Sequence, residues 1–151
     1  MATRSRIGLM LEDGTIMNSY CHWDGYPTGV GQTLVMHYSD VDKIKELLSF
    51  GDMSFLAPNL NPVGVHSFDN PENGVTVFYK RDRGETGSVD SVVTTLDEYQ
   101  SVKYSSYIDF LYLFKDGKWF VSNTCNDKGW QLVKKYLAGY DLTDDDISCT
   151  M

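Results

Sequence analysis

The segment at residues 20–32 holds the side chains of this chain that are best suited to chemistry. It reads YCHWDGYPTGVGQ and places an imidazole, an indole, a carboxylate and a phenol close together. These groups belong to His22, Trp23, Asp24 and Tyr26. The three glycines of the segment permit close approach of a backbone or a ligand, and binding residues are concentrated on loops. The segment therefore predicts a binding site.

Gly29 and Gly31 lie where a helix is expected to begin. A helix N-terminus presents unpaired N–H groups and the positive end of the helix dipole, which together favour a phosphate or a carboxylate. The local pattern is neither the P-loop signature nor the dinucleotide-binding fingerprint. Two interpretations stay open: the glycines help to seat a small anion, or they only let the loop turn and pack.

Arg4 and Arg6 are two positions apart in an extended segment, so their side chains project from the same face. Guanidinium groups placed together repel each other unless an anion, a carboxylate or an aromatic ring lies between them. In one interpretation they contact the phosphate or ribose of a ligand whose base stacks on Trp23 and Tyr26. In the other, acidic side chains such as Asp24 neutralise them.

His22 and Cys21 are adjacent, which disfavours a shared metal ion and a Cys–His nucleophile because neighbours on a strand point to opposite faces. His37 and His66 add no recognised metal-ligand spacing, so the sequence predicts neither a metal site nor a cofactor. His22 and Asp24 alternate and are able to form an acid–base pair, but no Ser or Cys nucleophile accompanies them. An enzyme is thus the less favoured class, and no catalytic residue is assigned.

Composition limits the class of protein. The 151 residues are 42% hydrophobic and 13% aromatic, which is enough for the core of one domain. The net charge of −8 disfavours duplex nucleic acid, whose binding depends on Lys and Arg at the phosphates. We expect one domain over residues 1–140 and an acidic tail over residues 141–151.

Several signals indicate a cytosolic protein. No apolar run has the length of a membrane span, and the first residues lead into an alternating strand instead of a signal peptide. The three cysteines are widely spaced and odd in number. This pattern predicts reduced thiols and no disulfide.

Two β-hairpins are expected, over residues 5–22 and 107–122, because alternating apolar segments flank turns that contain Gly. A further strand is expected at residues 75–79, followed by a basic turn at residues 80–84. A long loop is expected over residues 57–74, which are rich in Pro, Asn and Gly. With helices between the strands, the pattern predicts a single α+β domain with a mainly antiparallel sheet of two or more hairpins and about three helices.

Apolar side chains recur at helical spacing in three segments. The expected helices lie near residues 30–38, 40–49 and 129–138. Asp40 is the expected N-cap of the second helix, and Gly51 marks its end. Residues 88–104 are ambiguous and allow one more helix around residues 96–102.

Three motifs in the first third of the chain carry a family resemblance: TRSRIG at residues 3–8, YCHWDGYP at residues 20–27 and GVG at residues 29–31. They look like motifs of a family of small, mostly uncharacterised accessory proteins of tailed bacteriophages, and YLFKDGKW at residues 112–119 is similar to the C-terminal hairpin of that family. The resemblance implies a phage protein in the cytoplasm of a bacterial host, without a particular activity. Such accessory proteins commonly modify host physiology or counter host defence.

Three hypotheses for function remain open. The first is a non-enzymatic protein that captures a small anionic ligand, with a nucleotide-derived immune signal as the candidate, to counter host defence. Its expected ligand-binding residues are Arg4, Arg6, His22, Trp23, Asp24, Tyr26, Gly29 and Gly31. The second is an acidic interaction protein that inhibits a host enzyme through the aromatic loop. The third and weaker one is a small hydrolase or transferase that uses His22 and Asp24. A homo-oligomer is compatible with all three.

Overall fold

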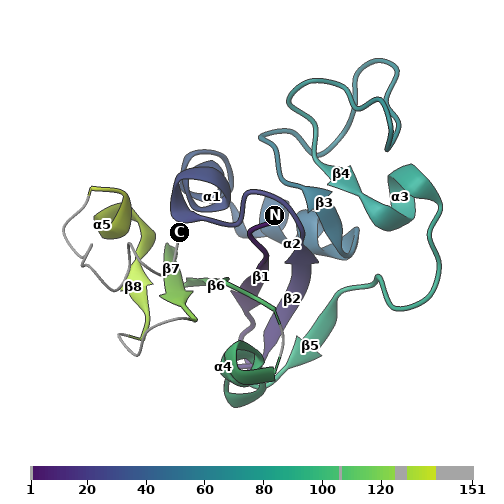
Figure 1. Ribbon diagram of the computed structural model, residues 1–151. Helices are drawn as coiled ribbons and strands as arrows, with labels where there is room; N and C mark the ends of the chain where they lie inside the picture. The colour runs from purple at the N-terminus through teal and green to yellow at the C-terminus, as the bar shows by residue number, and fades with distance from the viewer. Residues whose placement is uncertain (1, 106, 125–128, 139–151) are drawn as a thin grey trace.

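The computed structural model describes residues 2–105, 107–124 and 129–138 (Figure 1). In this part of the chain, five α-helices and one π-helical turn accompany a mixed, mainly antiparallel sheet of eight strands. The predicted single α+β domain is therefore confirmed. The expected acidic tail lies outside the described residues.

The sheet has the strand order β4-β3-β2-β1-β6-β7-β8, and β5 also pairs with β2. β5 lies beside the first half of β2, whereas β3 meets β2 only at its last residue. Figure 1 shows β4 and β8 at opposite sides of the sheet, with β1 and β2 between them. The strands are β1 (Ser5–Met10), β2 (Ile16–Cys21), β3 (Met53–Phe55), β4 (Val77–Phe78), β5 (Val92–Thr94), β6 (Phe110–Lys115), β7 (Lys118–Asn123) and β8 (Gln131–Leu132).

Both predicted hairpins are confirmed, since β1 pairs antiparallel with β2 and β6 with β7. The turn of the second hairpin places Asp116 and Gly117 at φ values of 53° and 75°. A type I′ turn requires two such left-handed residues, and Asp-Gly is among the pairs that adopt it most readily. β1 and β6 then pair in parallel, with Arg6 opposite Leu111, and join the hairpins into one sheet.

The helices expected near residues 30–38 and 40–49 are confirmed, and a helix also lies at the ambiguous residues 96–102. The helical elements are η1 (Pro27–Gly31, a π-helical turn), α1 (Gln32–His37), α2 (Val41–Ser49), α3 (Tyr79–Arg83), α4 (Leu96–Ser105) and α5 (Val133–Leu137). Asp40 caps α2, because its Oδ1 accepts a hydrogen bond from the Asp42 amide at 3.0 Å. Gly51 follows the end of α2 with a φ of 84°, a conformation that favours glycine.

The helix expected near residues 129–138 is shorter than predicted. Gln131 and Leu132 pair with β7 as strand β8, so α5 begins only at Val133. The apolar spacing in this segment does not distinguish one helix from a short strand followed by a helix.

The prediction for residues 75–84 needs a second correction. The strand ends at Phe78, and the expected basic turn is the helix α3. Asp82 explains the change, because its Oδ2 accepts a hydrogen bond from the Phe78 amide at 2.8 Å. This carboxylate satisfies an amide that a helix start leaves unpaired.

The two faces of the sheet are covered unequally. One face carries the larger core, where Ile7, Leu34 and Tyr112 belong to a cluster that includes residues of α1, α2 and α5. The opposite face carries a smaller core around Tyr99 and Leu111, which packs against α4. A single helix is therefore the main cover of the second face.

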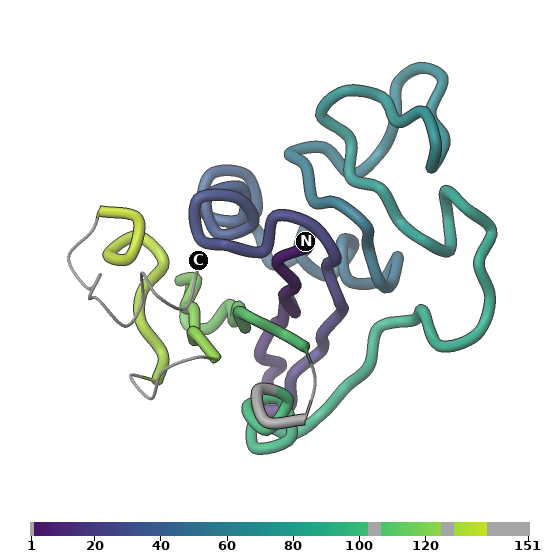
Figure 2. Tube along the Cα trace, viewed as in Figure 1, coloured from purple at the N-terminus to yellow at the C-terminus, as the bar shows by residue number. Residues whose placement is uncertain are grey.

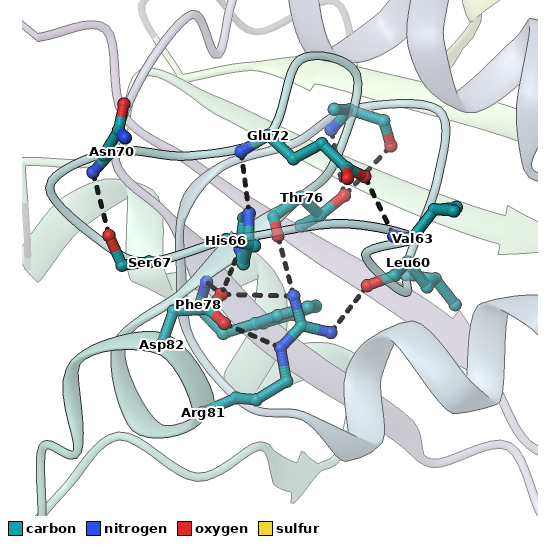
Figure 3. A network of polar contacts seen from close by, with 11 residues as sticks. Leu60, Val63, His66, Ser67, Asn70, Glu72, Thr76, Phe78, Arg81 and Asp82 are labelled. Carbon is teal, nitrogen blue, oxygen red and sulfur yellow. Dashed lines mark hydrogen bonds and ion pairs between the residues drawn. The ribbon is translucent and has the colours of Figure 1, made fainter.

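The long loop expected at residues 57–74 is confirmed, and it extends beyond β3 and β4 at the upper right of Figure 2. A buried polar network holds its two ends (Figure 3). The Arg81 guanidinium bonds to Asp82 and donates to the carbonyl oxygens of Leu60 and Thr76. These bonds fix the loop without an apolar core of its own.

His66 extends this network into the middle of the loop (Figure 3). Its Nδ1 accepts a hydrogen bond from the Glu72 amide at 2.9 Å, so a proton on the neutral ring belongs to Nε2. Nε2 lies 3.2 Å from Asp82 Oδ2. The Glu72 carboxylate in turn accepts hydrogen bonds from the amides of Val63 and Gly64, which orders the tip of the loop.

Candidate functional site

Arg4 and Arg6 lie on the face of the sheet that α4 covers only in part. A cavity of about 550 Å³ opens above them, and both arginines line it. A volume of this size is typical of small-molecule sites, which occupy roughly 300–1,000 Å³. The two predicted arginines therefore line a cavity that is large enough for a small ligand.

Three parts of the chain build this cavity, which we call the arginine cavity. β1 and β2 form its floor, β5 with the segment that leads into it forms one wall, and α4 with the segment that leads into β6 forms another. Its lining residues include Arg4, Arg6, Asn18, Tyr20, Asp52, Asp90, Val92, Tyr99 and Tyr107. The floor is charged and polar, whereas the α4 wall contributes mainly apolar and aromatic groups.

Neither guanidinium on the cavity floor is neutralised by a carboxylate among the described residues. The ion pairs found there belong to His66, Lys80 and Arg81. Arg6 instead donates from Nε to Asn18 Oδ1 at 2.8 Å, and this amide oxygen carries no net charge. Two positive charges thus face one cavity in a chain of net charge −8.

Arg4 lies beside an aromatic ring at the rim of the cavity. Its guanidinium carbon is 5.8 Å from the centre of the Tyr107 ring, within reach of a cation–π interaction. The Tyr107 side chain is 84% exposed. The ring therefore has a face available to a ligand that also contacts Arg4.

Tyr20 and His22 form a hydrogen-bonded pair next to Arg4. The Tyr20 hydroxyl lies 2.7 Å from His22 Nδ1. Burial lowers the pKa of His22, and the charge of Arg4 lowers it further. Burial raises the pKa of Tyr20, with the Arg4 charge acting in the opposite direction. Both side chains are therefore neutral at pH 7, and Arg4 and Arg6 supply the positive charge of the floor.

Asp52 occupies the gap beside β2 between β3 and β5. Its Oδ1 accepts a hydrogen bond from the Tyr20 amide at 2.9 Å, as a neighbouring strand would. Burial raises the pKa of Asp52, whereas the Tyr20 amide and the Arg6 charge lower it in part. Asp90, the other carboxylate of the cavity, pairs with Lys80 at 2.9 Å.

Trp23, Asp24 and Tyr26 do not line the arginine cavity. Trp23 is 45% exposed, contacts His22 edge to face at 4.7 Å and donates its amide to Ser54. The Tyr26 hydroxyl donates to Asp24 Oδ1 at 3.0 Å. The structure thus separates the predicted stacking rings from the predicted arginines.

A second cavity of about 260 Å³ lies beside this aromatic loop. Asp24 and Gly29 line it together with Met36 and Phe55. Trp23 and Tyr26 are exposed nearby, so the loop and the start of α1 present apolar side chains to solvent. We call Trp23, Tyr26, Met36 and Phe55 the aromatic patch.

The glycines of the loop lie in close contact with neighbouring backbone and side chains. The Gly29 amide donates to the Tyr26 carbonyl and the Val30 amide to the Asp24 carbonyl, so neither is available for an anion. Gly31 is buried, and a Cβ at this position would lie 3.2 Å from side-chain atoms of Tyr112. The anion seat expected at Gly29 and Gly31 stays a prediction.

His22, Asp24 and Cys21 each have a separate hydrogen-bond partner. His22 bonds to Tyr20 and Asp24 bonds to Tyr26, so the two side chains expected as an acid–base pair have separate partners. Cys21 is fully buried on the opposite face, and its Sγ donates to the Trp23 carbonyl at 3.7 Å. In the described part of the chain, no three His, Cys, Asp or Glu side chains are grouped to hold a metal ion.

Sequence reasoning found the two arginines and missed most of their neighbours. Asn18 and Tyr20 alternate on β2, and Tyr20 pairs with Arg6 across the predicted hairpin, so the hairpin register was a signal that could have found them. Asp52 and Tyr107 reach the cavity from distant segments, and nothing local in the sequence marks them.

Comparisons with protein-family models, curated proteins and solved structures give no match for this chain. Among the described residues, no helix has the length and apolar character needed to span a membrane. The site itself is therefore the basis for a functional proposal.

Proposed function

We propose that this protein captures a small anionic ligand in the arginine cavity and does not transform it. The observation that carries the proposal is that Arg4 and Arg6 face a cavity of about 550 Å³ without a carboxylate partner in the described residues. Guanidinium groups bind phosphates and carboxylates through paired, charge-assisted hydrogen bonds. A bound anion would supply the ion-pair partner that Asp52 and Asp90, the carboxylates of the same cavity, do not give Arg4 and Arg6.

A nucleotide-derived ligand fits the chemistry of this cavity best. Tyr107 offers a ring at the rim next to Arg4, and Tyr20 and Tyr99 line the interior. Aromatic side chains stack on nucleobases while arginines bind the phosphates. Together with the resemblance to phage accessory proteins, this supports a nucleotide-derived signal of host defence as the ligand, captured in the bacterial cytoplasm.

Thermal unfolding with added ligands tests the proposal. Pyrophosphate and a panel of linear and cyclic nucleotides are added at millimolar concentration, and at least one of them should raise the Tm by mass action. At a concentration 100 times the Kd, the stabilisation is about 2.7 kcal/mol. The variants Arg4→Gln and Arg6→Gln should lose this shift.

Lys115→Gln is the matched control, because it also removes one positive charge but lies at the exposed end of β6. Its ligand response should equal that of the wild type. If no anion in the panel shifts the Tm of the wild-type protein, the capture hypothesis is to be abandoned.

The aromatic patch supports a second candidate, an acidic interaction protein that inhibits a host enzyme. Exposed aromatic residues and methionine are enriched at protein interfaces, and the Met36 side chain is 63% exposed next to Phe55 and the second cavity. Native mass spectrometry of the protein purified from its bacterial host would detect a stoichiometric protein partner. Loss of that partner in Trp23→Ala and Phe55→Ala, but not in Arg6→Gln, would favour this second function.

A further inference from the structure

The arginine cavity carries charges of opposite sign on its two sides. Arg6 belongs to β1 and Arg4 directly precedes it, whereas Asp52 and Asp90 lie beyond β2. β2 lies between the two sides, and the Arg6 side chain reaches β2 through its hydrogen bond to Asn18. A ligand that spans the cavity must therefore offer an anionic group at one end and hydrogen-bond donors at the other.

Asp52 is the better placed of the two carboxylates to meet such donors. Asp90 is already paired with Lys80, and both of those side chains are exposed. Asp52 is half-buried, and its backbone is held on both sides, since its amide donates to Val89 and its carbonyl accepts from Tyr79. A carboxylate fixed in this way loses little freedom when a ligand binds.

The Asp52 carboxylate also has acceptor capacity to spare. Oδ1 accepts from the Tyr20 amide, while no hydrogen bond or ion pair within the described chain reaches Oδ2. An ionised carboxylate offers about four acceptor positions. Acceptor positions without a hydrogen bond are unfavourable in a half-buried carboxylate, so a donor from the ligand would stabilise Asp52.

We infer that the arginine cavity selects a guanine nucleotide, with Asp52 accepting hydrogen bonds from the base and Arg4 and Arg6 binding the phosphate. This inference rests on the proposed anion capture. Among the common bases, guanine presents two adjacent donors, N1–H and the N2 amino group, which match the two oxygens of a carboxylate. Uracil presents one donor between two acceptors, and those acceptors would face a negative charge.

Asp52→Asn is the informative substitution. An asparagine keeps an oxygen for the Tyr20 amide, but it replaces the second oxygen by an N–H donor. The hydrogen bond from the Tyr20 amide is thus retained, while the base meets a hydrogen-bond donor in place of an acceptor. Removing one negative charge should leave pyrophosphate binding equal or make it tighter, because Arg6 then has less competition.

Calorimetric titration with pyrophosphate, GMP, IMP and UMP separates the two proposals. The wild-type protein should bind GMP at least about tenfold more tightly than UMP, the minimum expected when charged hydrogen bonds are at stake. IMP, which lacks the N2 amino group, should lie between them. In Asp52→Asn the ratio of GMP to UMP affinity should fall to about one while pyrophosphate still binds.

The possible failures are distinct. If neither pyrophosphate nor any of the nucleotides binds the wild-type protein, anion capture itself is wrong. If pyrophosphate binds but GMP, IMP and UMP have equal affinities, the cavity takes anions and the assignment of the base to Asp52 is overturned. The comparison of the three nucleotides uses the wild-type protein alone, so the inference stays falsifiable even if Asp52→Asn does not fold.

Discussion

Trp23 and Trp119 show at the scale of single residues how much the surroundings decide a side chain's role. Trp23 is 45% exposed, whereas Trp119 is 5% exposed and donates from Nε1 to the Tyr38 carbonyl at 2.7 Å. Removal of a buried aromatic side chain leaves a cavity and an unpaired carbonyl, whereas removal of an exposed one leaves neither.

The two tryptophans should therefore differ in stability measurements. Trp23→Ala is expected to lower the free energy of unfolding by about 1 kcal/mol or less, and Trp119→Ala by about 3–5 kcal/mol. Urea unfolding followed by circular dichroism measures both. A loss of 3 kcal/mol or more in Trp23→Ala would mean that this ring belongs to the core.

Asp82 links the long loop to pH. Burial by itself would raise the pKa of Asp82, but hydrogen bonds from Arg81, from the Phe78 amide and from His66 outweigh it and lower the pKa below the ordinary value of 3.8. A carboxyl group whose pKa is lower in the folded state stabilises the fold above its unfolded pKa. This contribution is lost as the pH falls through the folded pKa.

Asp82→Asn should cost about 3 kcal/mol at neutral pH, because it leaves Arg81 without its buried partner. The difference from the wild type should shrink as the pH is lowered below about 4. Asp90→Asn breaks only the exposed pair with Lys80 and should cost about 1 kcal/mol or less. Urea unfolding over a pH series tests this, and a pH-independent difference would show that the Asp82 charge is not what matters.

At the scale of elements, α2 is fixed by its two ends. Its N-cap bond and the glycine after its last turn satisfy groups that a helix leaves unpaired. Asp40→Ala should lower the free energy of unfolding by about 1 kcal/mol. Asp42→Ala, in the first turn, is the control that removes a charge without removing the cap, and it should cost less.

The same scale explains which elements could be predicted from the sequence. The hairpins and α2 follow from alternation, turn residues and caps, all of which are local. The parallel pairing of β1 with β6 joins segments about 100 residues apart, and no local pattern specifies it. The helix α3 depends on the hydrogen bond between the Phe78 amide and the Asp82 carboxylate. The sequence showed only a basic segment, which was predicted to be a turn.

The residues of the candidate site also fall into those that a local pattern predicts and those that only the distant strand pairing places. Arg4 and Arg6 were found because their alternation on one strand is visible in the sequence. Trp23 and Tyr26 were grouped with them by nearness in the chain, but neither ring lines the arginine cavity. Tyr107 reaches the cavity only through the β1–β6 pairing.

At the scale of the whole molecule, the sheet is anchored at its centre and thin at one edge. β1 and β6 each have a strand on both sides, whereas β5 has three residues, two of them exposed valines. Local opening is easiest where few buried contacts hold a segment. The outer wall of the arginine cavity is thus among the easier parts to open.

Hydrogen exchange should show this gradient. Amides of β1 and β6 should exchange only with global unfolding, and the hydrogen-bonded amides of β5 should exchange at least about tenfold faster. A ligand in the arginine cavity should slow β5 selectively. Equal protection in β1 and β5 without ligand would indicate that the wall is as firm as the centre.

The buried Cys21 makes the protein its own reporter of unfolding. Burial raises the pKa of this thiol to about 12, so at neutral pH it is almost entirely protonated as well as shielded. Alkylation requires an accessible thiolate. In a chain with Cys125→Ser and Cys149→Ser, iodoacetamide should therefore label Cys21 only in molecules that have opened their core. The labelling rate, read by mass spectrometry, would record how often the fold opens in its native buffer, without denaturant.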